Sequence, residues 1–275
     1  METKEESRVG SWELPEALWE ALLPFLPTKR GTKGRKITVD FRTIFAGIFF
    51  VLRTGIQWQA CPRERFGPPS TVYHYFSRAC EEGIFLNVWE KALEVYDELK
   101  GLDWKWQSVD GAMTKAPLGG EATGKNPTDR GKLGTKRSVL VEGKGIPIAI
   151  VSDGANRNDM KLLGQTLDAV VTERPVATEE KPQNLCLDKG YDFQECSEAA
   201  LNRDYTPHIR TRGEEKKEKE TYPDYRPRRW VVEVCHSWLN RFRKILVRFE
   251  KNLETHLGLL QFACAYIVLK RAGNF

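Results

Sequence analysis

The sequence predicts an α/β protein in which a helical N-terminal region precedes a mixed sheet with flanking helices. Apolar residues recur at helical spacing through the first hundred residues. Near Gly101 the pattern changes to alternating, β-branched runs, and three strand-like runs are followed by alternating helices and short strands. This order is typical of a mixed sheet with helices packed on it. We therefore expect two regions, residues 1–100 and residues 101–275.

The first region contains four segments with helical periodicity, at residues 12–26, 38–53, 70–83 and 85–100. Ser70 follows two prolines and is the expected N-cap of the third helix. A helix, a turn and a further helix resemble a helix-turn-helix, which would place that further helix in a major groove. Any all-helical segment would show the same pattern, so a purely structural role stays open. The candidate DNA contacts on this helix are Thr71, Tyr73, His74 and Arg78.

The second region is expected to alternate between strands and helices. Its strands are predicted at residues 102–110, 136–145, 146–154, 184–188 and 205–210. Its helices are predicted at residues 158–171, 193–203, 228–249 and 256–272, the last apolar on most faces. Asn158 is the expected capping residue of the first of these helices.

The predicted helix at residues 228–249 carries one acid, Glu233, among six basic residues. An apolar stripe would pack it onto the core, and a second face would carry Arg229, Glu233, His236, Asn240, Arg241 and Lys244. A helix of this charge attracts a polyanion. The alternative is a solvated basic helix in which Glu233 pairs with Arg229 one turn earlier.

Composition restricts the class of protein. The chain of 275 residues is 40% hydrophobic, with a net charge of +5. Basic clusters favour phosphate backbones, although such clusters are also common on solvated surfaces. The six cysteines form no C-x-x-C pair and have no histidine at zinc-ligand spacing, which favours free thiols in a reducing compartment. The N-terminus lacks a signal sequence, and the most apolar run has nine residues, so we expect a cytoplasmic protein without a membrane span.

Two aspartates, Asp110 and Asp188, each end a predicted strand. Either one alone is a common turn or cap residue. Together with Glu233 they form three carboxylates that an α/β fold can bring to one edge of its sheet. Such a cluster repels itself unless a cation occupies it, and hard divalent metals prefer oxygen ligands. Two metal ions in such a site support phosphodiester chemistry.

These residues lie in motifs that resemble the DDE transposases of bacterial insertion sequences, specifically the insertion sequence five group. The likeness runs through GIQWQACPRERFGPPSTVYHYFSR, SVDGAMTKAP, LDKGYD and RRWVVEVCHSWLNRFRKILVRFEK, and so covers almost the whole chain. The resemblance implies a ribonuclease-H-like catalytic domain at residues 101–275, preceded by a helical DNA-binding region at residues 1–100. It assigns Asp110, Asp188 and Glu233 as the catalytic triad that binds two Mg²⁺ ions, for which Mn²⁺ would substitute.

The same resemblance implies cleavage at the terminal inverted repeats of an insertion sequence and joining of the freed ends to target DNA. It also implies a homodimer on double-stranded DNA and association with the bacterial nucleoid during the reaction. Arg229 matches the arginine expected four residues before the glutamate. The tyrosine expected three residues before Arg229 is replaced by Arg226, and the basic residue expected seven positions after the glutamate is replaced by Asn240, with Arg241 beside it.

Several assignments keep alternatives. Arg229, Asn240, Arg241 and Lys244 are candidate phosphate contacts, and Lys189 and His236 are candidate contacts to the scissile phosphate. Lys189 could instead cap the sheet edge, and His236 could be a structural histidine. A catalytically idle DNA-binding protein derived from a transposase, or a ribonuclease-H-like nuclease that hydrolyses without joining, would share most of these features.

Overall fold

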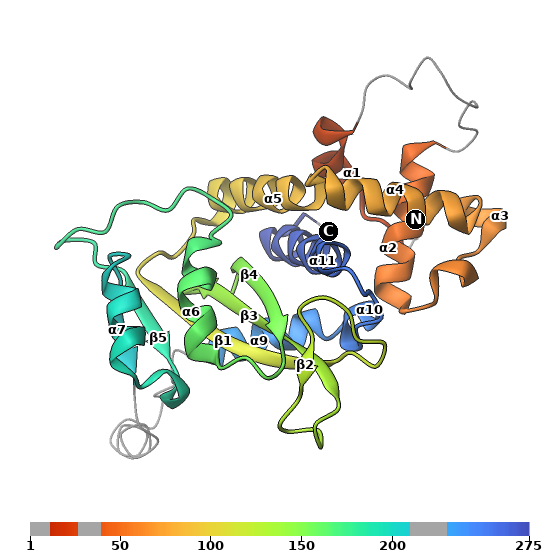
Figure 1. Cartoon of the computed structure of the whole chain (residues 1–275). Helices are drawn as coiled ribbons and strands as arrows, with labels where there is room; N and C mark the ends of the chain where they lie inside the picture. Colours follow the sequence, from red (N-terminus) through yellow and green to blue (C-terminus); the bar gives the residue numbers. More distant parts are fainter. Residues whose placement is uncertain (1–11, 27–39, 210–229, 275) are drawn as a thin grey trace, which may run out of the picture.

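The computed structural model describes residues 12–26, 40–209 and 230–274 of the chain. A helical N-terminal part is followed by a mixed sheet with helices on both faces (Figure 1), as expected. The helices of the first part are α1 (Glu16–Leu22), α2 (Phe41–Thr54), α3 (Arg63–Phe66), α4 (Pro69–Glu81) and α5 (Ile84–Lys100), with short 3₁₀ turns η1 (Leu23–Phe25) and η2 (Trp58–Ala60).

Local sequence sets the ends of these helices. Asp40 caps α2 by accepting a hydrogen bond from the Thr43 amide at 2.9 Å, and Gly55 ends it at a φ of 74°. Helix α4 begins one residue earlier than predicted, because Pro69 occupies its first position, where a missing amide hydrogen costs nothing. Ser70 therefore lies inside the helix and is not its N-cap.

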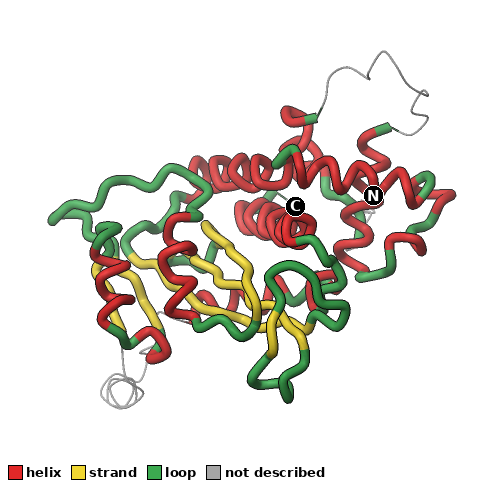
Figure 2. The backbone as a smooth tube through the Cα atoms, viewed as in Figure 1, coloured by secondary structure: helices red, strands yellow, loops and turns green. Residues whose placement is uncertain are grey.

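Within the described residues the sheet has six strands, which Figure 2 draws in yellow: β1 (Trp106–Lys115), β2 (Gly124–Lys125), β3 (Leu133–Glu142), β4 (Pro147–Gly154), β5 (Asn184–Leu187) and β6 (Thr206–Ile209). Strands β1, β3 and β4 are antiparallel neighbours, and β5 and β6 continue the sheet parallel to β1. The order β4-β3-β1-β5-β6 is that of a ribonuclease-H-like sheet, which confirms the predicted fold class.

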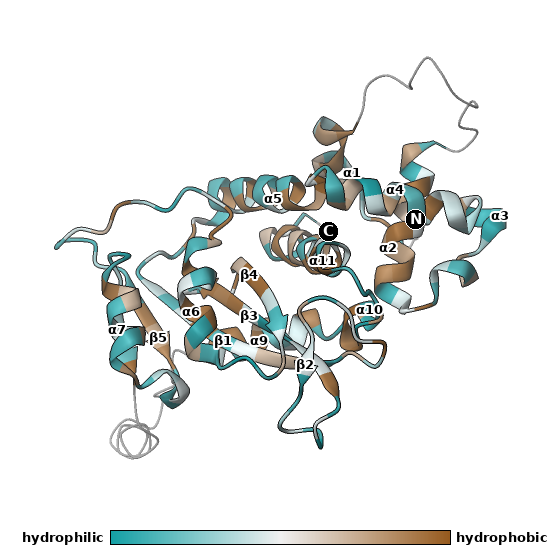
Figure 3. Cartoon of the chain, in the orientation of Figure 1, coloured by the Kyte–Doolittle hydropathy of each residue, from teal (hydrophilic) through white to brown (hydrophobic). Residues whose placement is uncertain are grey.

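Helices cover both faces of this sheet. They are α6 (Asp159–Asp168), α7 (Gln194–Leu201), α9 (Trp230–Leu239), α10 (Arg243–Leu246) and α11 (Leu253–Ala272), with the 3₁₀ turn η3 at Lys189–Tyr191. Helix α11 is buried on most faces, as predicted, and lies against α5 in Figure 1. Figure 3 shows apolar residues concentrated on α11 and on β3 and β4, where the core lies. No helix in the described ranges has the length and apolar character of a membrane span.

The prediction of one helix over residues 228–249 is wrong. Helix α9 ends at Leu239, and after a turn the buried Phe242 adopts an extended conformation before the short helix α10. Phe242 packs edge-on against Tyr266 of α11, with ring centres 5.4 Å apart. The chain then returns to the sheet, where the amide of Arg248 donates to the Lys115 carbonyl at 2.8 Å. Tertiary packing thus overrides the helical periodicity.

A single buried apolar cluster includes residues of both halves of the chain, from Leu18 of α1 to Ala272 of α11. The indole of Trp89 in α5 donates to the Pro147 carbonyl of β4 at 3.2 Å, a buried link between the helical part and the sheet. The division of the chain into two domains at residue 100 remains a prediction.

Candidate active site

Asp110 lies in the middle of β1 and not at its end, because the strand continues to Lys115. The apolar pattern stops at Asp110, but the backbone ladder with β3 runs on through Gly111 and Ala112. Pairing with a buried neighbour strand, which the sequence of β1 itself does not show, keeps these residues extended. The Asp110 carboxylate is therefore fixed to a central, rigid strand.

Asp188 follows directly after β5, as predicted. The last paired residues of β1 and β5 are Ser108 and Cys186, so Asp110 and Asp188 lie two residues further along neighbouring parallel strands. The Asp188 side chain accepts a hydrogen bond from the Gly190 amide at 2.7 Å and so caps the turn η3. Asp188 therefore caps this turn and also belongs to the candidate site. Its neighbour in the sequence, Lys189, is exposed.

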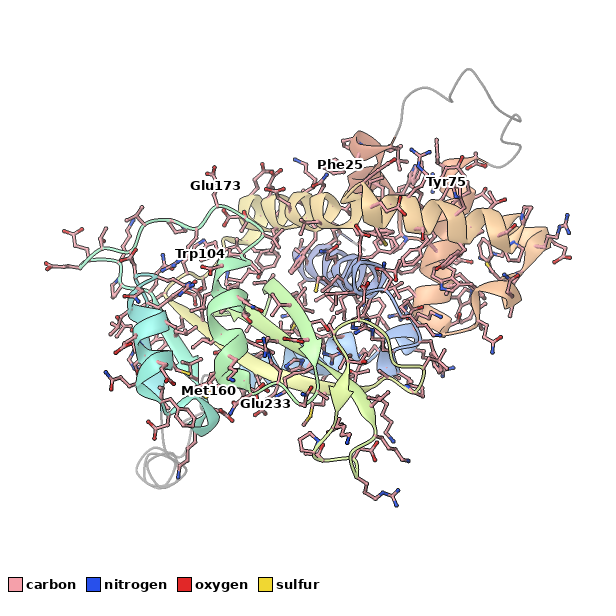
Figure 4. The ribbon with its side chains drawn as sticks, viewed as in Figure 1. Phe25, Tyr75, Trp104, Met160, Glu173 and Glu233 are labelled. Carbon is pink, nitrogen blue, oxygen red and sulfur yellow. The ribbon has the colours of Figure 1, made fainter. Side chains whose placement is uncertain are left out.

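Glu233 lies in the first turns of α9 with an exposed side chain. Its neighbours Val231 and Val232 are buried against the core and fix the helix to the sheet. In the view of Figure 4, Glu233 lies at the lower edge of the sheet. Its charge contributes to the raised pKa of Asp110, so the structure brings the third predicted acid to the part of this edge near Asp110.

A fourth carboxylate, Asp159, reaches this edge from the first turn of α6. Its Oδ2 pairs with the Lys136 ammonium at 2.9 Å, and its Oδ1 is buried without a hydrogen-bond partner. A Cβ on Gly111 would lie 2.1 Å from that Oδ1, so only glycine beside Asp110 permits this approach. Asp159 cannot be identified as a site residue from the sequence, because an acid after the N-cap Asn158 is indistinguishable from an ordinary helix-start residue.

The electrostatics of Asp110 show that these acids converge. Burial raises the pKa of Asp110 to about 6, and the charges of Asp188, Asp159 and Glu233 add to the rise, while a hydrogen bond from the Gly111 backbone opposes it. The pKa of Tyr191 is also raised, mainly by burial and further by Asp159, Asp110 and Asp188. Four carboxylates, one from a strand, one from a strand end and two from helices, therefore share one negative site.

This donor set fits a hard divalent cation, which prefers carboxylate oxygens and would relieve their mutual repulsion. The Oδ1 of Asp159 is buried without a hydrogen-bond partner, and the raised pKa of Asp110 marks negative charge that its neighbours do not neutralise. Within the described ranges no three His, Cys, Asp or Glu side chains stand close enough to hold an ion as they are placed. Binding an ion therefore requires the carboxylates to approach one another.

His236 is buried on the inner side of α9, with its Nε2 3.8 Å from Asp110 Oδ2. The Arg137 guanidinium donates to His236 Nδ1 at 3.3 Å and to Asn240 Oδ1 at 2.7 Å. Burial and the charge of Arg137 lower the pKa of His236 to about 3. His236 is thus a neutral histidine between Arg137 and Asp110, and Asn240 is partly engaged within the protein.

The remaining basic candidates of this segment differ in exposure. Arg241 is exposed in the turn after α9. Lys244 is buried, 3.2 Å from Glu250 Oε1 and 5.4 Å from the Trp58 ring centre. The predicted common face of residues 228–249 is therefore wrong for Lys244, because the break after Leu239 rotates it into the protein. Arg226, Arg228 and Arg229 lie outside the described residues.

The candidate contacts of α4 lie on its outer face. Tyr73, His74 and Arg78 are exposed and Thr71 is half-buried. Arg78 pairs with Glu82 one turn later, which occupies part of its charge. Tyr73 lies 5.4 Å from the Trp58 ring centre and lines a 730 Å³ cavity that Phe249 also lines. This face is accessible, but no described interaction tests its role in binding.

Two family models match the chain. Residues 103–268 match the family described as "Transposase DDE domain", and residues 14–89 match the family described as "Putative transposase of IS4/5 family". The first match covers more than half of the chain and includes Asp110, Asp188 and Glu233.

Two curated relatives come from Burkholderia cepacia. The "Putative transposase for insertion sequence element IS402" is 33% identical over 157 residues, which cover 55% of this chain and 72% of the relative. The "Insertion element IS402 uncharacterized 16.2 kDa protein" is 25% identical over 118 residues, 42% of this chain and 80% of the relative. A solved structure of the Mos1 transposase paired-end complex with left transposon end has a TM-score of 0.27 at 9% identity over 91% of this chain and 83% of that one. That likeness is too distant to support an argument.

Proposed function

Because the chain belongs to the family of DDE transposase domains and is thus a DNA transposase, we propose that it binds the terminal inverted repeats of an insertion sequence, cleaves there and joins the ends to target DNA. The observation that carries this proposal is the convergence of carboxylates around Asp110, whose pKa rises to about 6. Negative charge held against its own repulsion is typical of a phosphoryl-transfer site that works with divalent cations.

We assign Asp110, Asp188 and Glu233 as the catalytic carboxylates. Asp110 is fixed in the central strand β1, Asp188 at the neighbouring strand end, and Glu233 on α9. The three therefore approach a substrate from rigid elements, which favours a defined geometry for in-line displacement. Asp159 holds Lys136 and adds negative charge at the same edge.

The family is metal-dependent, and we propose that Asp110, Asp188 and Glu233 hold two Mg²⁺ ions, with Mn²⁺ as a substitute. When bound, such ions would neutralise the charge that develops on the attacking and leaving oxygens. The chain's own residues position this site. Neutral His236 fills the space beside Asp110 without adding a cation that would compete for the carboxylate.

DNA contacts are proposed on both sides of the acids. Lys189 beside Asp188 and Arg241 after α9 are exposed and suited to phosphate oxygens. Arg229 stays a proposed phosphate contact on the strength of its motif. Thr71, Tyr73, His74 and Arg78 on the outer face of α4 are proposed to contact the bases of the terminal repeat. We further propose a homodimer on DNA that brings two ends together, acting in the bacterial cytoplasm.

The test uses purified protein and labelled DNA carrying the terminal repeats of its own element, with Mg²⁺, Mn²⁺ or Ca²⁺. We expect metal-dependent nicking and a joined product, both absent in Asp110→Asn. Glu195→Gln, which removes one exposed charge from α7, is the matched control and should cleave normally. Cleavage by Asp110→Asn at the wild-type rate would contradict the site assignment.

Two other outcomes would redirect the proposal. Tight, specific binding of the repeats without cleavage in any metal would identify an idle DNA-binding protein. Free ends without joined product, at all concentrations of target DNA, would identify a nuclease that hydrolyses without strand transfer.

A further inference from the structure

A cationic site lies away from the acidic candidate active site, where the C-terminal ends of α2, α9 and α11 meet. It is a pocket of 230 Å³ whose lining includes four basic side chains, Arg53, Arg241, Lys270 and Arg271. We refer to it as the Arg271 pocket. The four residues come from three helix ends far apart in the sequence, so the cluster is a product of the fold.

Aromatic rings hold these cations in place. The Arg53 guanidinium lies 4.7 Å from the Phe242 ring centre and 5.3 Å from that of Tyr266. Arg271 lies 4.9 Å from the Trp238 ring centre, and Lys270 lies 5.8 Å from that of Tyr266. Stacked cations lose less conformational freedom when they bind an anion, which favours affinity.

The positive charge of the pocket is larger than the negative dipole charge of the three helix ends that surround it. Cations at helix C-termini are stabilised by the helix dipole, but three helix ends supply only roughly 1.5 negative charges, about half a charge each. Four basic side chains therefore leave an excess. No described carboxylate lines the pocket, and no described ion pair engages Arg241, Lys270 or Arg271.

The pocket lies at one end of a surface whose other end is the candidate active site. Glu233 and Ser237 are exposed one helical turn apart on α9, and Arg241 follows after another four residues. At a rise of 1.5 Å per residue, the helix from Glu233 to its end at Leu239 spans about 9 Å, and the turn to Arg241 brings the separation to roughly 10–12 Å. That length corresponds to roughly three or four nucleotides along one strand at 3.4 Å each.

We propose that the Arg271 pocket binds two adjacent backbone phosphates of duplex DNA, three and four nucleotides from the phosphodiester held at the acids. This inference rests on the proposed function, because it takes the acids as the site of cleavage. The pocket would fix the direction in which the duplex leaves the active site along α9. Its contacts are to phosphate, so they carry no base specificity.

The test measures how the affinity for duplex DNA of arbitrary sequence depends on salt, by fluorescence anisotropy. In Lys270→Gln/Arg271→Gln, loss of two phosphate contacts should reduce the slope of log K against log salt by about 1.8. Between about 50 and 200 mM NaCl, the wild type should then lose about tenfold more affinity than the variant. Lys100→Gln/Lys181→Gln removes two exposed charges elsewhere and should keep more of the wild-type slope.

Arg271→Lys separates charge from packing, because it keeps the cation beside Trp238 and should retain the slope. Lys270→Gln alone should reduce the slope by about half as much as the double variant. An unchanged slope in the folded double variant, or an equal loss in the control, would overturn the inference. If the wild type cleaves the DNA ends of its element, and the pocket variants show the same slope of log K against log salt as the wild type, this inference alone is overturned. A wild type without affinity for duplex DNA would overturn the proposed function as well.

Discussion

The Nε of Arg137 donates to Nδ1 of His236 at 3.3 Å, which leaves the ring proton on Nε2, 3.8 Å from Asp110. Arg137 is itself buried in β3 and bonds the carboxamide oxygen of Asn240. A buried arginine that pairs with no carboxylate among the described residues thus sets the tautomer of the histidine beside the central acid. This relationship links the sheet, the end of α9 and the candidate site.

The depressed pKa of His236 predicts a loss of stability in acid. Above pH 6.5 the ring is neutral in both folded and unfolded chains. As pH falls from 6.5 toward the folded pKa of about 3, only the unfolded chain gains the proton, so the free energy of unfolding falls by about 1.4 kcal/mol per pH unit. The pKa of the buried His256 is also lowered to about 3, so His236→Gln should remove about half of the combined dependence in urea titrations between about pH 4 and 7. His74→Gln, on the exposed face of α4, should leave it unchanged.

The raised pKa of Asp110 predicts a stability change of the opposite sign. Below its ordinary pKa of 3.8 the carboxyl is protonated in both states, and stability is lost as pH rises through the folded pKa of about 6. Asp110→Asn should therefore stabilise the metal-free protein above pH 6, by roughly 1–2 kcal/mol after allowance for solvent screening. Urea titration at neutral and acidic pH checks this. A gain of equal size at both pH values would exclude ionisation as the cause.

Divalent cations should stabilise the folded protein. At a metal concentration about a hundredfold above Kd, the expected gain is about 2.7 kcal/mol. The gain should be smaller below pH 6, because binding requires the ionised form of Asp110. Thermal melting with Mg²⁺ or Mn²⁺ measures this without any reaction. Asp110→Asn should lose most of the gain and Glu195→Gln should keep it; an equal gain in all three proteins would place the metal elsewhere.

The buried pair of Lys244 and Glu250 predicts a structural role for this lysine. Both side chains are only 5% exposed, so Lys244→Met would leave Glu250 buried and unpaired. We expect a loss of roughly 3–5 kcal/mol in the free energy of unfolding, which Lys244→Met/Glu250→Gln should partly restore. The salt dependence of DNA binding should be unchanged in the double variant, whereas Arg241→Gln should reduce its slope by about 1. A reduced slope in the Lys244 variants would contradict this structural role and support the phosphate contact of Lys244 that the sequence predicts.

The contact between Gly111 and Asp159 predicts a coupled pair. A methyl group at residue 111 would lie 2.1 Å from Asp159 Oδ1 and must displace that carboxylate. Gly111→Ala should cost about 1–3 kcal/mol by urea unfolding, and much less when Asp159 is already replaced by Ala. Equal costs in the two backgrounds would show that the backbone, and not Asp159, rejects the side chain.

Several predictions from the sequence hold because they depend on neighbouring residues. The helix cap at Asn158 and the strand before Asp188 arise from local hydrogen bonding and local apolar pattern. The order of strands and helices follows from changes of periodicity along the chain, and the family follows from motifs that contain Asp110, Asp188 and Glu233.

What the sequence by itself determined is thus the mixed α/β class and the family, together with three acids at the proposed site. Only the tertiary structure decided that β1 continues through Asp110, that α9 stops at Leu239, and that Asp159 joins the acids. It also buried Lys244 and gathered the cations around Arg271. Each of these outcomes depends on partners more than twenty residues away or on burial of one ring, Phe242, against another helix. Local periodicity contains no information about such contacts, because they exist only after the sheet and helices have packed.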